Sequence, residues 1–543
     1  MALLQVENLS FTYPQCTASA IREVSFSVEQ GSFVGVSGAT GSGKSTLLRL
    51  VKRELAPLGT QTGRILMNGT PMEELPPKES AFSVGYVMQR PEQQIVTDKV
   101  WHELAFGLEN MGLPQQEIAR RVAEMAAYFG MESWFDQSVS SLSGGQKQLL
   151  NLAAVMVMQP QLLILDEPTA QLDPIAASDF IATIRKLNRD MGLTVLIIEH
   201  RLEEVIPLCD QLLVMDQGRL LACGGPRSVI AELSDKPELL CAMPAAARLH
   251  HMLQAEGPCP LDVREGRMLI SRYGNATPAL PEEPAQAPHP IALEMKDVFF
   301  RYEKNAPDVL QCLNLTLQER EILCVLGGNG SGKTTMLTVA AALNKAHHGS
   351  IRIFGKKQKE YRNQSLYREC LTLLPQDVQT VFLCNTVREE LADAQAGLDL
   401  LPFDLSPLLD RHPYDLSGGE QQLVALAKVL ATKPRILLMD EPTKGIDAAA
   451  KLRLAEILRQ LRDSGMALLI VTHDVEFAAL CADRCALFFR GNIISEGAPR
   501  AFFGENSFYT TAVSRMTRGH YRRAVTVEDA AALCQRNGRR EQP

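Results

Sequence analysis

The sequence predicts an α/β chain of two tandem domains, each built around a mainly parallel β-sheet. Two observations lead to this prediction: a glycine-rich phosphate loop occurs twice, and the residues around the two loops keep the same spacing. Tyr13 precedes Gly38 by 25 residues, as Tyr302 precedes Gly327. The length of 543 residues allows several domains, and the internal repeat favours two large ones.

The two glycine-rich loops, residues 38–45 and 327–334, fit the pattern G-x-x-x-x-G-K-[ST]. Each follows an apolar, strand-like run, a context that separates a phosphate loop from a chance match. Glycines let backbone N–H groups converge on phosphate oxygens at a helix N-terminus, and the lysine adds a positive charge. One such loop could be a glycine-rich turn with an exposed lysine, but two in the same context make that alternative negligible. The residues expected to bind ATP here are Gly38, Gly41, Gly43, Lys44, Ser45 and Thr46, and Gly327, Gly330, Gly332, Lys333, Thr334 and Thr335.

Two further apolar runs, residues 163–165 and 437–439, each end in an Asp-Glu pair. Such continuous apolar runs suit strands that are covered on both faces of a sheet. An aspartate at the end of such a strand can hold Mg²⁺ through water, and the adjacent glutamate can polarise an attacking water molecule. We therefore expect Asp166 and Asp440 to contribute to metal binding, and Glu167 and Glu441 to be the catalytic bases.

The composition argues against two classes of function. The formal net charge of −8 lacks the basic character typical of nucleic-acid binding, so we expect no nucleic-acid partner. No apolar run approaches the ~18–20 residues needed to cross a bilayer, and the N-terminus has no signal-peptide pattern. We expect a soluble, cytoplasmic chain.

The chain contains twelve cysteines, whose spacing does not predict a metal site. Cys481 and Cys485 form a close pair, but no second pair or histidine couple matches it. Cys312, Cys324 and Cys384 lie in apolar stretches, where we expect them to be small core residues.

The repeats define the expected domain boundaries. The first domain covers residues 1–235 and the second covers residues 291–517. Residues 236–290 are expected to be a linker, partly helical and then Pro/Ala-rich, which reads as a semi-rigid spacer. Residues 518–543 form a basic tail. It is either a solvated face or a contact for a partner or anionic lipid headgroups.

The remaining motifs resemble those of the ATP-binding cassette (ABC) family. Residues 142–146 (LSGGQ) and 416–420 (LSGGE) each precede an Ala/Leu-rich helix, and a glutamine and a histidine of each copy stand at the family positions. The resemblance covers nearly all of both domains. It implies tandem P-loop NTPase domains, each with a mainly parallel sheet core, an N-terminal antiparallel β subdomain and a helical signature subdomain.

The resemblance also assigns roles to these residues. It implies an intramolecular head-to-tail pseudo-dimer, in which ATP on one domain's phosphate loop is capped by the other domain's signature. Tyr13 and Tyr302 match the aromatic residue that stacks on adenine, with a core aromatic as the alternative. The other implied ATP contacts are Gln89, Ser143, Gly144, Gly145, Gln376, Ser417, Gly418 and Gly419. The implied Mg²⁺ sites are Ser45, Gln89 and Asp166, and Thr334, Gln376 and Asp440; the implied catalytic residues are Glu167 and His200, and Glu441 and His473.

No catalytic position is visibly degenerate in either half, so we expect two hydrolytic sites. Glu420 replaces the usual glutamine of the signature, a departure that leaves the glycine N–H donors untouched.

The segment that contains the first glutamine, residues 85–107, looks like the ATPases of energy-coupling factor (ECF) transporters, which import vitamins and metal ions. Residues 260–267 and 443–447 also look like fused two-cassette members of that group. This resemblance implies an ATPase at the cytoplasmic face of the cell membrane. Its implied partners are an integral membrane coupling protein and a membrane substrate-binding component.

Two alternatives stay open. One is the ATPase subunit of another ABC transporter, for peptides, sugars or export. The other is a ribosome-associated twin-cassette ATPase. The Pro/Ala-rich linker and the acidic net charge argue against the second alternative.

Overall fold

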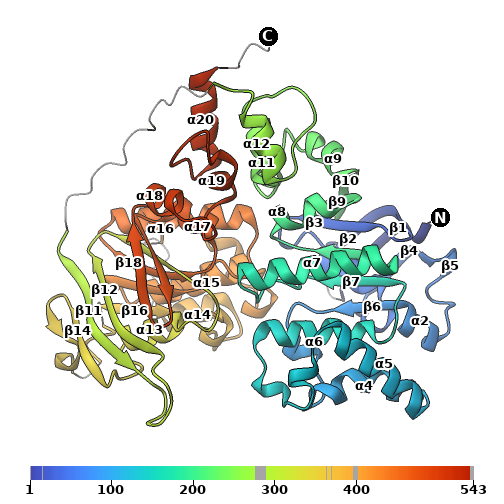
Figure 1. The fold of residues 1–543 in the computed structure, drawn as a ribbon, viewed down its shortest axis with the longest axis horizontal. Helices are drawn as coiled ribbons and strands as arrows, with labels where there is room; N and C mark the ends of the chain where they lie inside the picture. Colours follow the sequence, from blue (N-terminus) through green and yellow to red (C-terminus); the bar gives the residue numbers. More distant parts are fainter. Residues whose placement is uncertain are drawn as a thin grey trace. The chain divides into compact units, whose positions relative to one another are not determined.

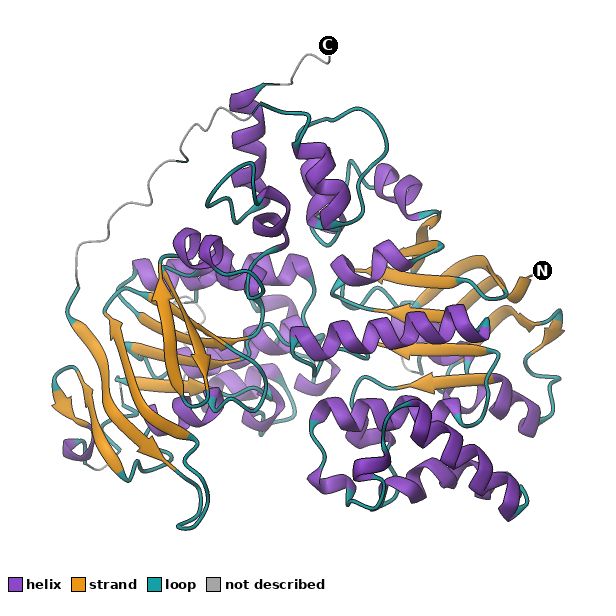
Figure 2. Ribbon diagram, viewed as in Figure 1, coloured by secondary structure: helices purple, strands orange, loops and turns teal. Residues whose placement is uncertain are grey.

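The structure, a computed structural model, describes residues 2–14, 16–274, 280, 289–362, 364–368, 370–394 and 401–538. It divides into two compact units, residues 1–244 and 245–543 (Figures 1 and 2). Each unit contains one four-stranded and one six-stranded sheet. The boundaries at residues 235, 290 and 517 remain predictions.

The N-terminal unit begins with an antiparallel sheet of order β2-β1-β4-β5. Its strands are β1 (Ala2–Thr12), β2 (Ile21–Glu29), β4 (Thr60–Met67) and β5 (Thr70–Pro71). Alternating burial along β2 shows that this sheet has one covered face.

The six-stranded sheet of this unit has the order β10-β9-β3-β8-β7-β6, with only the β10–β9 edge pair antiparallel. Its strands are β3 (Phe33–Gly38), β6 (Val84–Val87), β7 (Leu162–Asp166), β8 (Thr194–Ile198), β9 (Gln211–Asp216) and β10 (Arg219–Gly224). Alternate residues of β7 belong to two different hydrophobic clusters, one on each face of the sheet. The expectation of a strand covered on both faces is confirmed.

The helices of the N-terminal unit follow the strands as crossover connections and as a separate group. They are α1 (Lys44–Val51), α2 (Pro77–Ser83), α3 (Pro91–Gln94), α4 (Val100–Asn110), α5 (Gln115–Tyr128), α6 (Gly144–Met156), α7 (Pro174–Met191), α8 (Leu202–Val205), α9 (Pro226–Glu232) and α10 (Pro237–Leu240). Figure 1 shows α4, α5 and α6 gathered at one end of the unit. They form a helical subdomain that carries the signature motif at the start of α6.

The C-terminal unit repeats both sheets, with orders β12-β11-β14-β15 and β16-β17-β18-β13-β19-β20. Its strands are β11 (Ile291–Phe300), β12 (Leu310–Gln318), β13 (Ile322–Leu326), β14 (His348–Ile353), β15 (Lys356–Lys357), β16 (Leu371–Leu374), β17 (Ile436–Asp440), β18 (Ala467–Thr472), β19 (Arg484–Phe489) and β20 (Asn492–Gly497). Its helices are α11 (Ala245–Met252), α12 (Val263–Ile270), α13 (Lys333–Ala340), α14 (Val387–Asp393), α15 (Gly418–Leu430), α16 (Ala448–Asp463), α17 (Val475–Cys481), α18 (Pro499–Glu505), α19 (Ala512–Thr517) and α20 (Val527–Asn537). The predicted fold class, with its parallel core, antiparallel subdomain and signature helices, is confirmed in both units.

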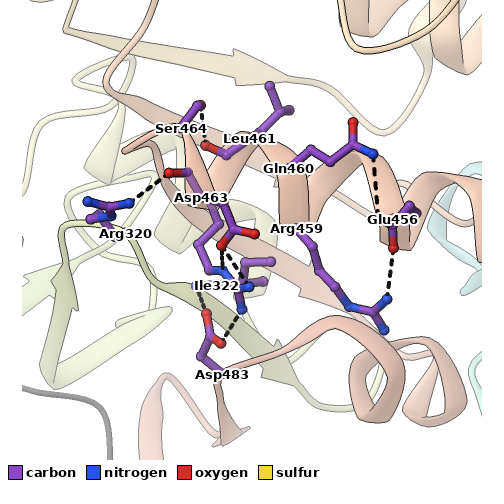
Figure 3. A network of polar contacts seen from close by, with 10 residues as sticks. Arg320, Ile322, Glu456, Arg459, Gln460, Leu461, Asp463, Ser464 and Asp483 are labelled. Atoms are coloured by element: carbon purple, nitrogen blue, oxygen red, sulfur yellow. Dashed lines mark hydrogen bonds and ion pairs between the residues drawn. The ribbon is translucent and has the colours of Figure 1, made fainter.

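An aspartate fixes the start of the strand that leads into each phosphate loop. In the C-terminal unit, the Asp483 carboxylate accepts a hydrogen bond from the N–H of Ile322 (2.8 Å) and pairs with Arg462 (2.6 Å; Figure 3). In the N-terminal unit, Asp210 accepts from the N–H of Phe33 at 2.8 Å. Each aspartate also donates its own N–H to the carbonyl of the same strand residue, so the pair sets the register of that strand.

The cysteine expectations are met in part. Cys324 is buried and Cys384 is half-buried, whereas Cys312 is exposed, so the core assignment of Cys312 is wrong. Cys312 lies at a bulge of β12 with φ 53°, which turns two consecutive side chains outward. Within the described residues, no group of three or more His, Cys, Asp or Glu side chains is arranged to hold a metal ion.

In the part of the chain that the structure describes, none of the helices combines the length and the apolar character that a membrane span needs.

Candidate functional site

Each phosphate loop passes from a buried strand into a helix whose first residue is the lysine. The residues before the lysines, Gly43 and Gly332, have φ 96° and 105°, in the left-handed region that favours glycine. The Lys44 ammonium donates to the carbonyls of Gly38 and Ala39 at 2.8 Å each. Lys333 makes the equivalent bonds at 2.9 Å. The structure therefore contains two folded loops with a charged group already placed against the loop backbone.

Both loops contain a polar atom that suits an oxygen-rich ligand. The hydroxyls of Ser42 and Ser331 are buried and have no hydrogen-bond partner among the described residues. They occupy the same position of the two loops, one residue before the glycine that precedes the lysine. A buried hydroxyl without a partner costs stability unless a ligand satisfies it. The loops therefore fit a phosphate group.

Ser45 and Asp166, two residues expected at the first metal site, lie together in the structure. The Ser45 hydroxyl donates to Asp166 Oδ1 at 2.9 Å, and the Tyr86 hydroxyl donates to Asp166 Oδ2 at 2.9 Å. Burial and the neighbouring charge of Glu167 raise the pKa of Asp166. Sequence reasoning missed Tyr86, although it stands three residues before Gln89 in a stretch already singled out.

Thr334 and Asp440, expected at the second metal site, also lie together, but Asp440 has fewer hydrogen-bond partners than Asp166. Burial raises the pKa of Asp440 to about 6, against a hydrogen bond from Thr334 that lowers it. Asp440 Oδ1 is buried without a hydrogen-bond partner in the described ranges. Leu373 stands at the position of Tyr86 and has no hydroxyl to donate. A carboxylate oxygen left in this state, next to a threonine hydroxyl, is a donor set that suits Mg²⁺.

The two proposed bases adopt the same unusual backbone. Glu167 and Glu441 both have φ 48°, which costs of order 1–3 kcal/mol for a residue other than glycine. Their N–H groups donate to the neighbouring strand, to the carbonyls of Ile198 (3.0 Å) and Val471 (2.8 Å). Such strain concentrates at functional sites. Here the left-handed backbone makes each glutamate depart from the extended conformation at the end of its strand.

Each glutamate carboxylate contacts the predicted histidine. His200 Nε2 lies 2.8 Å from Glu167 Oε1, and His473 Nδ1 lies 2.8 Å from Glu441 Oε2. Burial acts to raise the pKa of Glu441, but the charge and hydrogen bonds of His473 outweigh it and leave that pKa below its usual value. An ionised glutamate is the form that a general base requires.

The two predicted glutamines differ. Gln89 Nε2 donates to Glu167 Oε2 at 2.6 Å, so Glu167 is held on both sides. Gln376 is exposed, and across the described residues no hydrogen bond joins it to Glu441. The structure therefore brings Gln89 into its site and leaves Gln376 outside; the metal role of both stays a prediction.

The two signature motifs begin helices through the same capping box. In α6, Ser143 Oγ accepts from the Gln146 N–H, and Gln146 accepts from the Ser143 N–H at 2.9 Å. In α15, Glu420 does the same for Ser417 at 2.8 Å. The substitution of glutamate for glutamine thus preserves the local geometry, with the first N–H groups of each helix at its positive end.

The two tyrosines lie beside the phosphate-loop helices. The hydroxyls of Tyr13 and Tyr302 lie 3.0 and 2.9 Å from the hydroxyls of Thr46 and Thr335. Tyr302 is 64 % exposed, while Tyr13 is half-buried. A largely exposed ring next to a phosphate loop suits stacking on a base better than core packing, and the adenine contact stays a prediction.

Comparison with known proteins agrees with this geometry. Residues 21–170 and 310–444 match the family model of the ABC transporter. A protein of Bacillus anthracis, named as an ABC transporter ATP-binding protein, is 40 % identical over 98 % of this chain and 99 % of its own length.

Two solved structures are also similar. The archaeal ribosome recycling factor aABCE1 shares the fold, with a TM-score of 0.59 and 19 % identity over 91 % of this chain and 90 % of its own. The cbiO1 protein of Clostridium perfringens, part of the ABC transporter complex cbiONQ, is 34 % identical. It covers 44 % of this chain and 95 % of its own, with a TM-score of 0.39.

Proposed function

The chain belongs to the ABC transporter family, and on that premise we propose that it energises an importer of the energy-coupling factor type. ATP-binding proteins of this family are ATPases coupled to transport, and this chain carries two such cassettes. The proposed substrate class is a vitamin, a vitamin precursor or a metal ion. The proposed location is the cytoplasmic face of the cell membrane.

The residues of the first site divide the chemistry among them. The loop N–H groups and Lys44 bind and orient the phosphates of ATP. Ser45 and Asp166 would hold Mg²⁺, which neutralises phosphate charge when bound. Glu167 accepts a proton from the attacking water, and His200 holds the glutamate in place.

The second site uses the equivalent residues. Lys333, Thr334 and Asp440 would take the places of Lys44, Ser45 and Asp166, with Glu441 as the base and His473 as its positioning partner. We propose that each site is completed by the signature of the other domain. The positive N-termini of α6 and α15 would then face the γ-phosphates.

The transporter proposal rests on the exposed surface of the segment that follows each glutamine. It presents an apolar side chain to solvent in both units, Val96 at 66 % exposure and Leu383 at 81 %. In each segment, a buried glutamate accepts hydrogen bonds from the backbone. Glu103 accepts from the N–H groups of Val96 and Thr97, with the shortest bond 2.8 Å long.

The second segment is held more firmly than the first. Glu390 accepts from the N–H groups of Leu383 and Cys384 and also pairs with Lys428 at 2.5 Å. A rigid loop that exposes an apolar tip is suited to contact with a partner protein. In the proposal, that partner is a membrane coupling protein, which also recruits a membrane substrate-binding component.

The test is a tagged pull-down of the full chain from gently solubilised native membranes, read by mass spectrometry. We expect a polytopic coupling protein and a small substrate-binding membrane protein. The double variant Val96→Asp/Leu383→Asp should lose both, whereas Leu58→Asp, at a position 85 % exposed, should keep them.

Two results would contradict the proposal. Recovery of ribosomal proteins with no membrane partner would overturn the transporter assignment. Recovery of paired transmembrane subunits without a separate substrate-binding membrane protein would favour another ABC transporter class.

A further inference from the structure

Described parts of the expected linker and tail pack together in the C-terminal unit, along with the last residues of the expected second domain. Helices α11 and α12 precede the second cassette in the chain, while α19 and α20 follow it. Helix α12 packs on α19, and α11 packs on α12, α19 and α20 (Figure 1). We call this group of four helices, residues 245–274 and 512–538, the helix clasp.

The clasp has its own hydrophobic core. Its fully buried side chains come from all four helices and include Leu249, Ile270, Val513, Met516 and Cys534. Gly266 marks the closest approach. A Cβ added there would lie 2.2 Å from Met516 Sδ and 3.1 Å from Ala246 Cβ. Glycine inside a helix costs about 1 kcal/mol relative to alanine, so its presence here fits a packing requirement.

Polar contacts join the two halves at both ends. Arg267 donates from Nε and Nη2 to the carbonyl of Arg515 at 3.0 and 2.8 Å. The Tyr521 hydroxyl donates to the carbonyl of Gly274 at 3.0 Å, and the Gly274 N–H donates to the carbonyl of Gly538 at 3.2 Å. The contact is therefore a specific joint with buried apolar area and directed hydrogen bonds.

The C-terminal half of the clasp is anchored on the second cassette. Arg500 pairs with Asp529 of α20 at 2.7 Å, and the Ala512 N–H donates to Glu476 of α17 at 2.7 Å. Val525 belongs to the main core of the cassette. The N-terminal half begins at Ala245, one peptide bond after the last residue of the first unit.

We propose that the clasp, rather than the Pro-rich stretch, is the joint that holds the first cassette to the second. With the clasp closed, the first unit is joined to the body of the second through the Pro244–Ala245 bond. With the clasp open, the covalent connection between the first unit and the second cassette would be longer by residues 245–290. A shorter tether raises the effective concentration of one cassette at the other.

The test cuts the covalent connection and asks whether the fragments stay together. A site-specific protease sequence is placed in residues 281–288 of the full chain, outside the described residues, with an affinity tag at the N-terminus. After complete cleavage, without nucleotide and with chelator, we expect both fragments to co-elute from the affinity and size-exclusion columns. The proposal is overturned if the wild-type fragments separate.

Two variants show whether the clasp is the cause. Gly266→Leu places a side chain against Met516 and should raise the dissociation constant of the cut fragments about tenfold or more. Arg264→Leu adds the same side chain at an exposed position of α12 and should leave the fragments together. Matching far-UV circular dichroism of the uncut variants excludes general unfolding.

Two further outcomes would also overturn the proposal. Cut Gly266→Leu fragments that stay together with wild-type affinity would mean that another contact joins the cassettes. Co-purification of two differently tagged uncut chains would mean that the clasp forms between two chains.

Discussion

The two ATP sites carry the same motif residues but are not organised alike. In the first unit, Glu167 is held by Gln89 and His200, and Asp166 by Ser45 and Tyr86. In the second unit, Glu441 contacts His473 while Gln376 is exposed, and one oxygen of Asp440 has no partner among the described residues. Identical motifs therefore give both sites the same functional groups. They do not determine how far those groups are preorganised before a ligand binds.

Residues outside the motifs produce the difference. Tyr86 corresponds to Leu373, which removes one hydrogen-bond donor from the second site. Glu199, beside His200, is buried and accepts from the Thr169 N–H at 2.8 Å, whereas Thr472 stands in its place beside His473. Burial raises the pKa of Glu199. The two sites thus place the carboxyl group beside the histidine differently: Glu199 precedes His200, whereas Asp474 follows His473 and pairs with Lys451 at 2.6 Å.

The largest expected effect tests whether both sites hydrolyse ATP. Glu167→Gln and Glu441→Gln each remove a proposed general base, a loss worth ~10²–10⁴ in the rate of that site. We expect steady-state ATPase activity to fall in both single variants and to fall further in the double variant. If one single variant keeps wild-type turnover, the site it alters is not hydrolytic and the two-site hypothesis is wrong.

The second prediction concerns the buried aspartates. The pKa of Asp440 is about 6 in the folded chain, above its ordinary value of 3.8, so the folded state binds this proton more tightly than the unfolded state. Stability therefore falls as the pH rises from about 4 to 6 and stays lower above that range, by up to roughly 3 kcal/mol. Asp440→Asn removes this cost and should stabilise the protein at pH 8, with little effect at pH 4.

Thermal unfolding without Mg²⁺ at both pH values measures this effect. Asp166→Asn is the matched variant in the first site. It should stabilise less, because it disturbs two hydrogen bonds from Ser45 and Tyr86. Equal stabilisation by the two variants, or none by Asp440→Asn at pH 8, would contradict the proposed difference.

The third prediction makes the first site resemble the second. Tyr86→Phe leaves the ring in place and removes the hydroxyl that donates to Asp166. Loss of a hydrogen bond to a buried carboxylate should lower the free energy of unfolding by about 1–3 kcal/mol. Leu373→Phe, a volume change at the equivalent strand position without a polar contact, is the control. A Tyr86→Phe protein as stable as the wild type would show that this hydrogen bond does not contribute.

The sequence predicted those parts of the site whose geometry is local. The phosphate loops, the capping boxes at Ser143 and Ser417 and the carboxylates at the strand ends each lie within a few consecutive residues. Contacts between distant segments were missed. Tyr86 contacts Asp166 from 80 residues away in the sequence, and neither motif indicates this pairing.

The helix clasp was missed for the same reason, although a signal existed. Asp262 and Thr526 cap α12 and α20, and each is followed three positions later by an acid that accepts from the N–H of the residue before the cap. The same capping pattern therefore begins one helix after each cassette. Short helices with small apolar faces do not reveal their partners, so the segments read as a linker and a tail.

The smallest expected effect separates the two glutamines. Gln89→Ala removes a hydrogen bond to the carboxylate of Glu167, which should cost about 1–2 kcal/mol of stability in the absence of nucleotide. Gln376→Ala removes an exposed side chain and should change stability by less than about 0.5 kcal/mol. Thermal unfolding of the nucleotide-free proteins measures both.

ATP and Mg²⁺ then sharpen this comparison. If the second site assembles only around its ligand, Gln376→Ala should reduce the stabilisation that ATP and Mg²⁺ give to the wild-type protein, because the glutamine would enter the site on binding. Gln89→Ala should reduce that stabilisation by a similar amount, since both glutamines would then contact the bound state. An unchanged ligand effect in Gln376→Ala would mean that Gln376 stays outside the site, and that the difference between the two cassettes persists through the catalytic cycle.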